Sequence, residues 1–81
     1  MKFCVYVLYS LKNKDLYVGS TGDLDNRIKL HNSGRVRSTK AYRPWELLEI
    51  RECNDRSGAV KLERFLKTGQ QKEILRKKYS V

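Results

Sequence analysis

The sequence contains few cysteines and no long apolar run, and each shortage excludes a class of protein. Two cysteines, Cys4 and Cys53, are too few for a disulfide framework and fit no metal-ligand spacing, so we expect both to be reduced and apolar. The longest apolar run, FCVYVLY, is far shorter than the roughly 20 residues that cross a bilayer, and no signal-peptide cleavage region follows it. These absences predict a protein of the cytoplasm that does not enter a membrane.

Acidic residues are also scarce relative to basic ones. The 81 residues include 18 lysines and arginines but 9 aspartates and glutamates, which gives a formal net charge of +9. Such a charge favours a polyanionic partner, and nucleic acid is the first candidate. A chain of this length buries one core, and the sequence contains no repeat, low-complexity segment or linker. Residues 1–81 are therefore predicted to form a single domain.

Apolar, β-branched and aromatic residues form short groups that predict the element order β-β-α-β-α-α. Strands are predicted at residues 2–10, 15–20 and 46–53, the first two as a hairpin. Thr21 or Asp23 begins a helix of about nine residues that ends near residues 32–34. Asn54 or Asp55 begins a second helix that runs to about Thr68 and is ended by Gly69, and residues 70–81 form a short basic helix. The predicted fold class is a small α/β (α+β) domain with a mainly antiparallel sheet flanked by helices.

Two of the predicted helices carry ionisable residues on their apolar sides. Because each residue advances a helix by about 100°, Arg27 and His31 fall between Ile28 and Leu30 in projection. Glu63 falls among the apolar residues of the second helix in the same way. A buried carboxylate without a partner costs several kcal/mol, so Glu63 requires a cation, a metal ion or a polar cleft beside it.

Helical projection leaves three interpretations open. In the first, Glu63 and Arg27 form a buried ion pair of structural value only. In the second, Arg27 and His31 face Glu63 across a polar cleft over the sheet, with the hydroxyls of Tyr6 and Tyr17 on its floor. The third concerns His31 alone, which would cap the C-terminus of its helix and interact with the helix dipole.

A polar cleft of this composition suits the hydrolysis of a phosphodiester bond. That reaction uses a divalent metal ion on oxygen ligands, a cation near the phosphate, and a group that orients or deprotonates water. One carboxylate with water molecules suits Mg²⁺ or Mn²⁺, whereas the sequence has no His/Cys cluster for zinc. Arg27 is the candidate for neutralising the phosphoryl oxygens, and a tyrosine near the metal is a candidate base.

The same residues carry a resemblance to a known family. CVY at residues 4–6 and YVG at residues 17–19 are followed by Arg27 and His31, by RPW at residues 43–45 and by KLERFLK at residues 61–67. This series resembles the GIY-YIG nuclease superfamily, in particular its small single-domain branch related to the catalytic module of the bacterial excinuclease incision subunit. The resemblance spans nearly the whole chain. It departs at Cys4, where the family's name has glycine, and at Ser20, where the excinuclease branch often has lysine.

The resemblance implies a three-stranded antiparallel sheet flanked by helices and a metal-dependent hydrolysis of DNA strands. It implies Glu63 as the ligand of Mg²⁺ or Mn²⁺ and Arg27 as the group that stabilises the phosphate and the transition state. Tyr6 becomes the candidate for the base or for orienting the water, with Tyr17 and His31 lining the site. Gly19 would leave space beside the two phenols.

The segment GRVRSTKAYRPW, residues 34–45, is here named the basic loop and is predicted to be exposed and to bind nucleic acid. Trp45 is expected in the core, and the cations of the loop are Arg35, Arg37, Lys40 and Arg43, interleaved with Tyr42. Such contacts position a substrate without reading its sequence, so recognition is expected to be loose or structure-selective. The final basic helix either extends this surface or closes the core through Ile74, Leu75 and Tyr79.

The leading hypothesis is a divalent-metal-dependent DNA endonuclease that acts in repair or on branched and single-stranded DNA. The alternative is a nucleic-acid-binding module with weak turnover or none. A third hypothesis, an interaction domain that docks on an acidic protein, is compatible with the same basic charge. Cleavage that depends on Glu63 distinguishes the first hypothesis from the other two.

Overall fold

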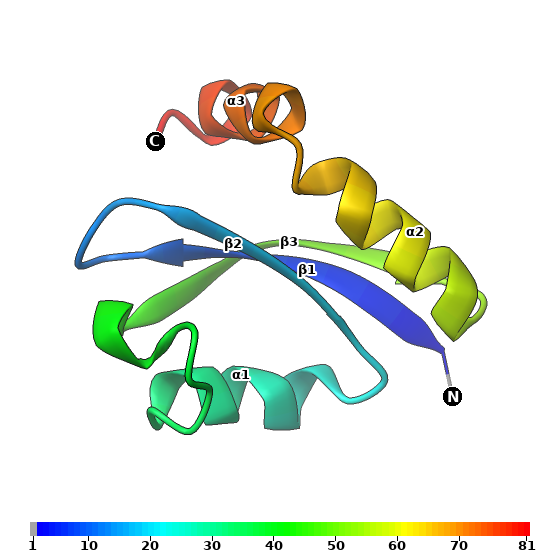
Figure 1. The fold of residues 1–81 in the computed structure, drawn as a ribbon, viewed down its shortest axis with the longest axis horizontal. Helices are drawn as coiled ribbons and strands as arrows, with labels where there is room; N and C mark the ends of the chain where they lie inside the picture. The colour runs from blue at the N-terminus through cyan, green and yellow to red at the C-terminus, as the bar shows by residue number, and fades with distance from the viewer. Residues whose placement is uncertain (1) are drawn as a thin grey trace.

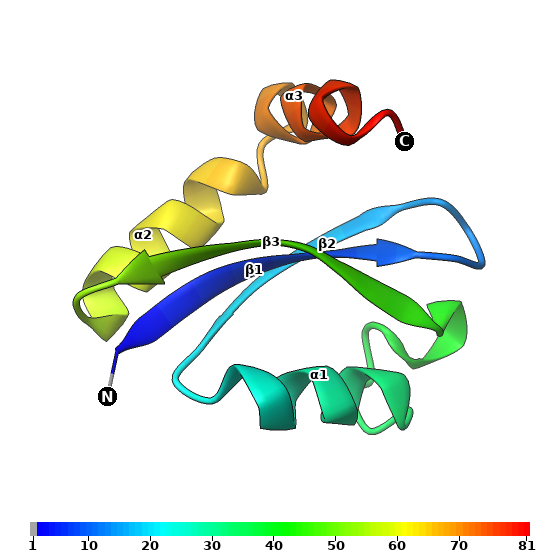
Figure 2. The ribbon, with the colours of Figure 1, turned by 180° about the vertical axis from the view of Figure 1, so that it is seen from behind.

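The protein forms a three-layer structure in which helices cover both faces of a three-stranded sheet (Figure 1). The computed structural model describes residues 2–81. Its elements, in chain order, are β1 (Phe3–Ser10), β2 (Leu16–Thr21), α1 (Leu24–Asn32), the 3-10 turn η1 (Lys40–Tyr42), β3 (Trp45–Cys53), α2 (Arg56–Leu66) and α3 (Gly69–Tyr79). The predicted element order and fold class are confirmed. Seen from behind, α1 lies below one face, and α2 and α3 lie across the other (Figure 2).

The sheet is antiparallel throughout, with strand order β2-β1-β3. Side chains alternate along the central strand β1, so one face of the sheet receives Val5 and Val7 and the other receives Tyr6 and Leu8. Both sets are buried because β1 is covered on both faces, which accounts for its continuous apolar sequence. The first set packs against α2 and α3, while the second packs against α1 and Trp45, which is buried as expected.

Side-chain caps define where the helices begin. Asp23 and Asp55, each expected as one of two candidate caps, accept hydrogen bonds from backbone N–H groups in the first turns of α1 and α2. The prediction that Gly69 ends the second helix is wrong. The helix α2 ends at Leu66, and Gly69 is the first residue of α3, because the Thr68 side chain caps α3 through the backbone N–H of Gln71.

One carboxylate attaches the C-terminal helix to the sheet. Glu49 of β3 accepts hydrogen bonds from the Lys78 ammonium at 2.7 Å, from the Tyr79 hydroxyl at 2.5 Å and from Arg51 Nε at 2.6 Å. Burial works against ionisation of Glu49, but these donors outweigh it and lower its pKa to about 2. Leu75 is buried in the core, whereas Ile74 is half-exposed, so α3 closes the core through Leu75 and Tyr79 but not through Ile74. No helix within residues 2–81 has the length and apolar character needed to cross a bilayer.

Candidate active site

A buried pair of polar rings occupies the face of the sheet that α1 covers. The hydroxyl of Tyr6, at the centre of β1, lies 2.9 Å from Nε2 of His31 in the last turn of α1. Tyr6 is 1 % exposed and His31 is 0 % exposed. The prediction that His31 points inward is therefore confirmed, and its imidazole is occupied by partners inside the protein rather than by the end of its own helix.

Strand register and a glycine determine where the Tyr6 hydroxyl lies. Gly19 of the edge strand β2 pairs with Tyr6, and a Cβ atom at Gly19 would come within 2.5 Å of the Tyr6 hydroxyl and 3.1 Å of the Tyr17 ring. The Tyr6 side chain thus leans beneath the backbone of β2 toward the free edge of the sheet. Gly19 provides the space that the expected pairing of the two tyrosines requires, and their ring centroids are 6.4 Å apart.

Tyr17 lies between the buried pair and the surface. Its ring makes edge contacts with His31 at 5.0 Å and with Trp45 at 6.0 Å between centroids, and it is only partly buried. The structure therefore brings four of the predicted site residues together. Tyr6 and His31 lie inside, and Tyr17 and Arg27 are partly exposed beside them.

Burial keeps Tyr6 and His31 uncharged at neutral pH. It raises the pKa of Tyr6 to about 12, although the Arg27 guanidinium nearby opposes this rise. It lowers the pKa of His31 to about 4, and the positive charge of Arg27 adds to this effect. The third interpretation of His31, in which it caps the C-terminus of its helix and interacts with the helix dipole, is wrong, because both ring nitrogens bond to Tyr6 and Thr39 instead.

Glu63 reaches the same edge of the sheet from the opposite face. One of its carboxylate oxygens accepts a hydrogen bond from Ser20 Oγ of β2 at 2.6 Å, and the other lies 2.7 Å from the Lys67 ammonium. Burial works against ionisation of Glu63, but the hydrogen bonds from Lys67 and Ser20 outweigh it and keep its pKa below the usual value. The negative charge is close enough to raise the pKa of Tyr6 slightly.

The first interpretation, an ion pair between Glu63 and Arg27, is wrong: within the part of the chain that the structure describes, Glu63 pairs with Lys67. The predicted cleft over one face also needs correction. Residues of α1 pack on one face of the sheet and residues of α2 on the other, so Arg27 and Glu63 approach from opposite faces. The candidate site is wrapped around the edge strand β2.

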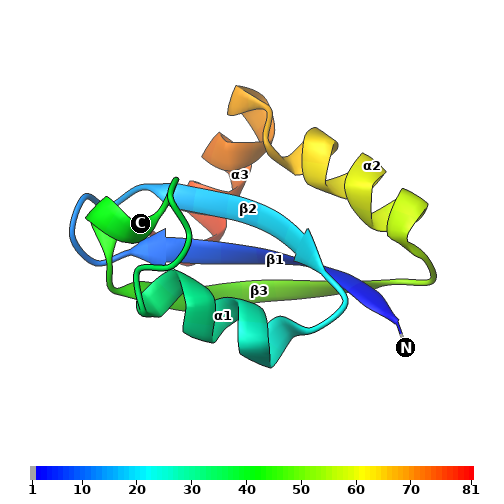
Figure 3. The same cartoon turned by 60° about the horizontal axis from the view of Figure 1, so that its bottom comes forward.

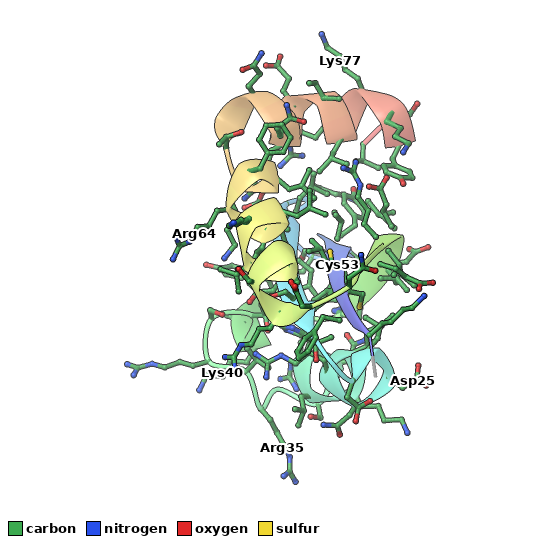
Figure 4. All side chains as sticks on the ribbon, turned by 90° about the vertical axis from the view of Figure 1, so that its right-hand side faces the viewer. Asp25, Arg35, Lys40, Cys53, Arg64 and Lys77 are labelled. Carbon is green, nitrogen blue, oxygen red and sulfur yellow. The ribbon has the colours of Figure 1, made fainter. Side chains whose placement is uncertain are left out.

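The basic loop is attached to the site through one buried residue. The prediction that the loop is exposed holds for its four cations but fails at Thr39, which is 0 % exposed and whose hydroxyl lies 2.8 Å from Nδ1 of His31. The Ser10 hydroxyl at the end of β1 donates a hydrogen bond to the carbonyl of Tyr42 and so holds the loop there. Figure 3 shows the loop running past that end of the sheet. Arg35 and Lys40 project outward in Figure 4, and Arg64 of α2 projects on the same side as Lys40.

A hollow lies at the C-terminal end of β2, away from the basic loop. Its volume is about 210 Å³, and its lining consists of Phe3, Ser20, Thr21, Gly22, Arg56 and Val60. Ser20 therefore forms part of this wall and also holds Glu63. Arg56 is exposed and has no carboxylate partner within residues 2–81. Cations thus lie at both ends of β2, with the candidate site between them.

Comparison with known proteins identifies the family of this chain. The family described as the GIY-YIG catalytic domain matches residues 2–80. The chain belongs to the GIY-YIG family. A UPF0213 protein of Bacillus halodurans, solved by solution NMR, is a structural neighbour of this GIY-YIG domain, with a TM-score of 0.57, 32% sequence identity, and 93% of this chain and 82% of that one covered.

Similarity to curated proteins falls into two groups. The UPF0213 protein of Syntrophus aciditrophicus is 34% identical over 73 residues, which are 88% of this chain and 83% of that protein. The structure-specific endonuclease subunit slx1 of Talaromyces marneffei is 38% identical over 68 residues, which are 75% of this chain but 18% of that protein. The chain thus corresponds to a small part of the endonuclease subunit and to most of the UPF0213 protein.

Several members of the site could not be recognised from the sequence because their partners belong to other elements of the fold. Ser20 and Glu63 are 43 positions apart, and Thr39 and His31 come from a loop and a helix. Ser20 stands where a lysine is often found in the excinuclease branch, yet Lys67, one helical turn after Glu63, brings an ammonium group to the site. The i,i+4 spacing of Glu63 and Lys67 was a readable signal for that pair.

The substitution Gly19→Ala tests whether the close approach of the Tyr6 hydroxyl to Gly19 is needed. The added methyl collides with the Tyr6 hydroxyl, so we expect the free energy of unfolding to fall by about 1–3 kcal/mol, as measured by urea denaturation. Gly69→Ala is the matched control, because nothing lies within 4 Å of its Cβ position. That variant is expected to be unchanged or more stable by up to about 1 kcal/mol. Equal stability of the two variants would contradict the packing described here.

Because His31 is buried and neutral, we expect the free energy of unfolding to depend on pH. The unfolded chain binds a proton at His31 near pH 6.5, whereas the folded chain does so near pH 4. Between these values the unfolded state binds more protons, so stability decreases as the pH falls, by about 2 kcal/mol between pH 7 and pH 5. Urea denaturation at both pH values should show this loss in the wild-type protein and not in His31→Gln. The same loss in both proteins would show that another group is responsible.

Proposed function

We propose that this GIY-YIG domain is a divalent-metal-dependent endonuclease that hydrolyses DNA phosphodiester bonds. The observation that carries the proposal is the convergence at the β2 edge of a cation, Arg27, an ionised carboxylate, Glu63, and a buried hydrogen-bonded pair, Tyr6 and His31. Phosphodiester hydrolysis requires electrostatic stabilisation, a metal-binding oxygen and a proton acceptor. These groups provide one of each.

The free edge of β2, an edge strand of the sheet, gives a path for one DNA strand. The basic loop, whose cations are Arg35, Arg37, Lys40 and Arg43, lies at one end, and the hollow beside Arg56 lies at the other. Cations at these positions neutralise phosphates on both sides of the site. Arg27 and Tyr17, which are partly exposed between them, would contact the phosphate that reacts.

Tyr6 and His31 would act together on the attacking water. In the free protein the phenol is protonated and the imidazole is neutral, so His31 is able to accept a proton. Tyr6 would take the proton of the water while its own proton moves to His31 Nε2, 2.9 Å away. Gly19, which has no side chain, leaves the room beside β2 that the Tyr6 hydroxyl occupies.

The chemistry of Glu63 fits a hydrated Mg²⁺ or Mn²⁺ ion. The carboxylate is ionised at neutral pH, its side chain is 21% exposed, and each oxygen keeps a lone pair beyond its contact with Ser20 or Lys67. Magnesium commonly binds through one or two carboxylates and retains several waters, so the lack of a cluster of three His, Cys, Asp or Glu side chains in residues 2–81 is compatible with this ion. When bound, the ion would polarise the phosphate and stabilise the leaving oxygen.

The proposed substrates are branched or single-stranded DNA. Support comes from relatives of the slx1 type, whose name describes a structure-specific endonuclease subunit. The exposed cations of the basic loop suit phosphate contacts, which position DNA without reading its sequence. We also propose that the protein acts in DNA repair and is located in the cytoplasm.

Nicking of supercoiled, single-stranded and branched DNA by purified protein tests the function. We expect cleavage with Mg²⁺ or Mn²⁺ and none with chelator, and a rate reduced by about 10²-fold or more in Glu63→Gln. Glu73→Gln makes the same chemical change at an exposed carboxylate of α3 and should cleave at the wild-type rate. DNA binding without cleavage under any condition would contradict the proposal and favour the nucleic-acid-binding module.

A further inference from the structure

Thr39 is a buried polar residue in the middle of the exposed basic loop. Its neighbours Ser38 and Lys40 are exposed, whereas Thr39 is completely covered. Its carbonyl accepts a hydrogen bond from Trp45 Nε1 at 3.0 Å. Its hydroxyl lies 2.8 Å from His31 Nδ1 and 3.4 Å from the carbonyl oxygen of Val36. The partner of one imidazole nitrogen decides which nitrogen carries the proton, so these contacts bear on the state of His31.

The hydrogen atoms at this site can be counted. A neutral imidazole carries one N–H, and Tyr6 and Thr39 each contribute one O–H. If the ring proton is on Nδ1, it is donated to Thr39 Oγ1. The Thr39 hydroxyl then donates to the carbonyl of Val36, and the Tyr6 hydroxyl donates to the bare Nε2. Every proton has an acceptor in this tautomer.

The other tautomer leaves one proton without an acceptor. If the ring proton is on Nε2, it must be donated to the Tyr6 oxygen. Within residues 2–81, His31 Nε2 is the only acceptor that bonds the Tyr6 hydroxyl, because the Arg27 guanidinium beside it can only donate, so the phenol proton would then be buried without an acceptor. Folded proteins rarely leave a buried polar group in this condition. The hydrogen-bond network therefore favours the proton on Nδ1.

We infer that Thr39 is a positioning residue, which holds His31 in the tautomer whose bare Nε2 faces Tyr6. In the reaction, an O–H bond of the water breaks and its proton goes to the Tyr6 oxygen, while the phenol proton goes to Nε2. The water oxygen bonds to phosphorus, and the leaving oxygen departs with its electron pair. His31 becomes an imidazolium whose Nδ1–H still donates to Thr39. The reaction step rests on the proposed nuclease function, whereas the tautomer is a property of the free protein.

His31 is the single histidine of the chain, so NMR can read its tautomer directly. Long-range ¹H–¹⁵N correlation spectra of ¹⁵N-labelled wild-type protein at pH 7 are expected to show a protonated Nδ1 and a bare Nε2 far downfield of it. A protonated Nε2 with a bare Nδ1 would overturn the inference. This measurement needs no substrate, so it is independent of whether the protein cleaves DNA.

Two variants separate positioning from packing. Thr39→Val keeps the shape of the side chain and removes the hydroxyl, so we expect its spectrum to shift toward protonated Nε2 and its cleavage rate to fall by about tenfold or more. Thr39→Ser keeps the hydroxyl and should retain the wild-type tautomer and most of the rate. An unshifted spectrum in Thr39→Val, or a shifted spectrum with an unchanged cleavage rate, would overturn the positioning role. If Thr39→Val does not fold, the wild-type spectrum and a loss of the tautomer in Thr39→Ser remain able to overturn it.

Discussion

The arrangement of the site depends on the contact between the Tyr6 hydroxyl and His31 beneath the backbone of Gly19. Strand register places Tyr6 opposite a residue without a side chain, so the phenol can lean toward the free edge of β2. The same register directs Ser20, the next residue of β2, to the opposite face, where it holds Glu63. One edge strand thus organises groups from both faces, and a shift of one residue would exchange the two faces.

The electrostatic layout separates neutral from charged groups. Tyr6 and His31 are kept uncharged by burial, while Arg27, Glu63 and Lys67 carry charge in partly exposed positions around them. The basic loop is joined to the neutral pair through Thr39, so its surface cations lie close to the groups proposed to carry out the chemistry. A substrate phosphate would therefore meet positive charge before it reaches the proton-transfer groups.

Local signals explain which parts of the structure could be predicted from the sequence. The strand β1, the caps Asp23 and Asp55 and the inward direction of His31 depend on short-range pattern and were predicted correctly. Helical projection also showed that Glu63 points toward the core. It could not show which face of the sheet each helix covers, and for that reason it left the ion pair with Arg27 open as an interpretation. The roles of Thr39 and Ser20 depend on tertiary contacts that leave no periodic signal.

The central claim is that Tyr6 and His31 act as one unit in proton transfer. The most direct test is a double-mutant cycle on the rate of metal-dependent DNA nicking, with Tyr6→Phe, His31→Ala and the combined variant, each verified as folded at the assay temperature. If the two residues act as one unit, the combined variant should cleave no more slowly than the slower single variant. Losses that multiply in the combined variant would show independent action and contradict the account.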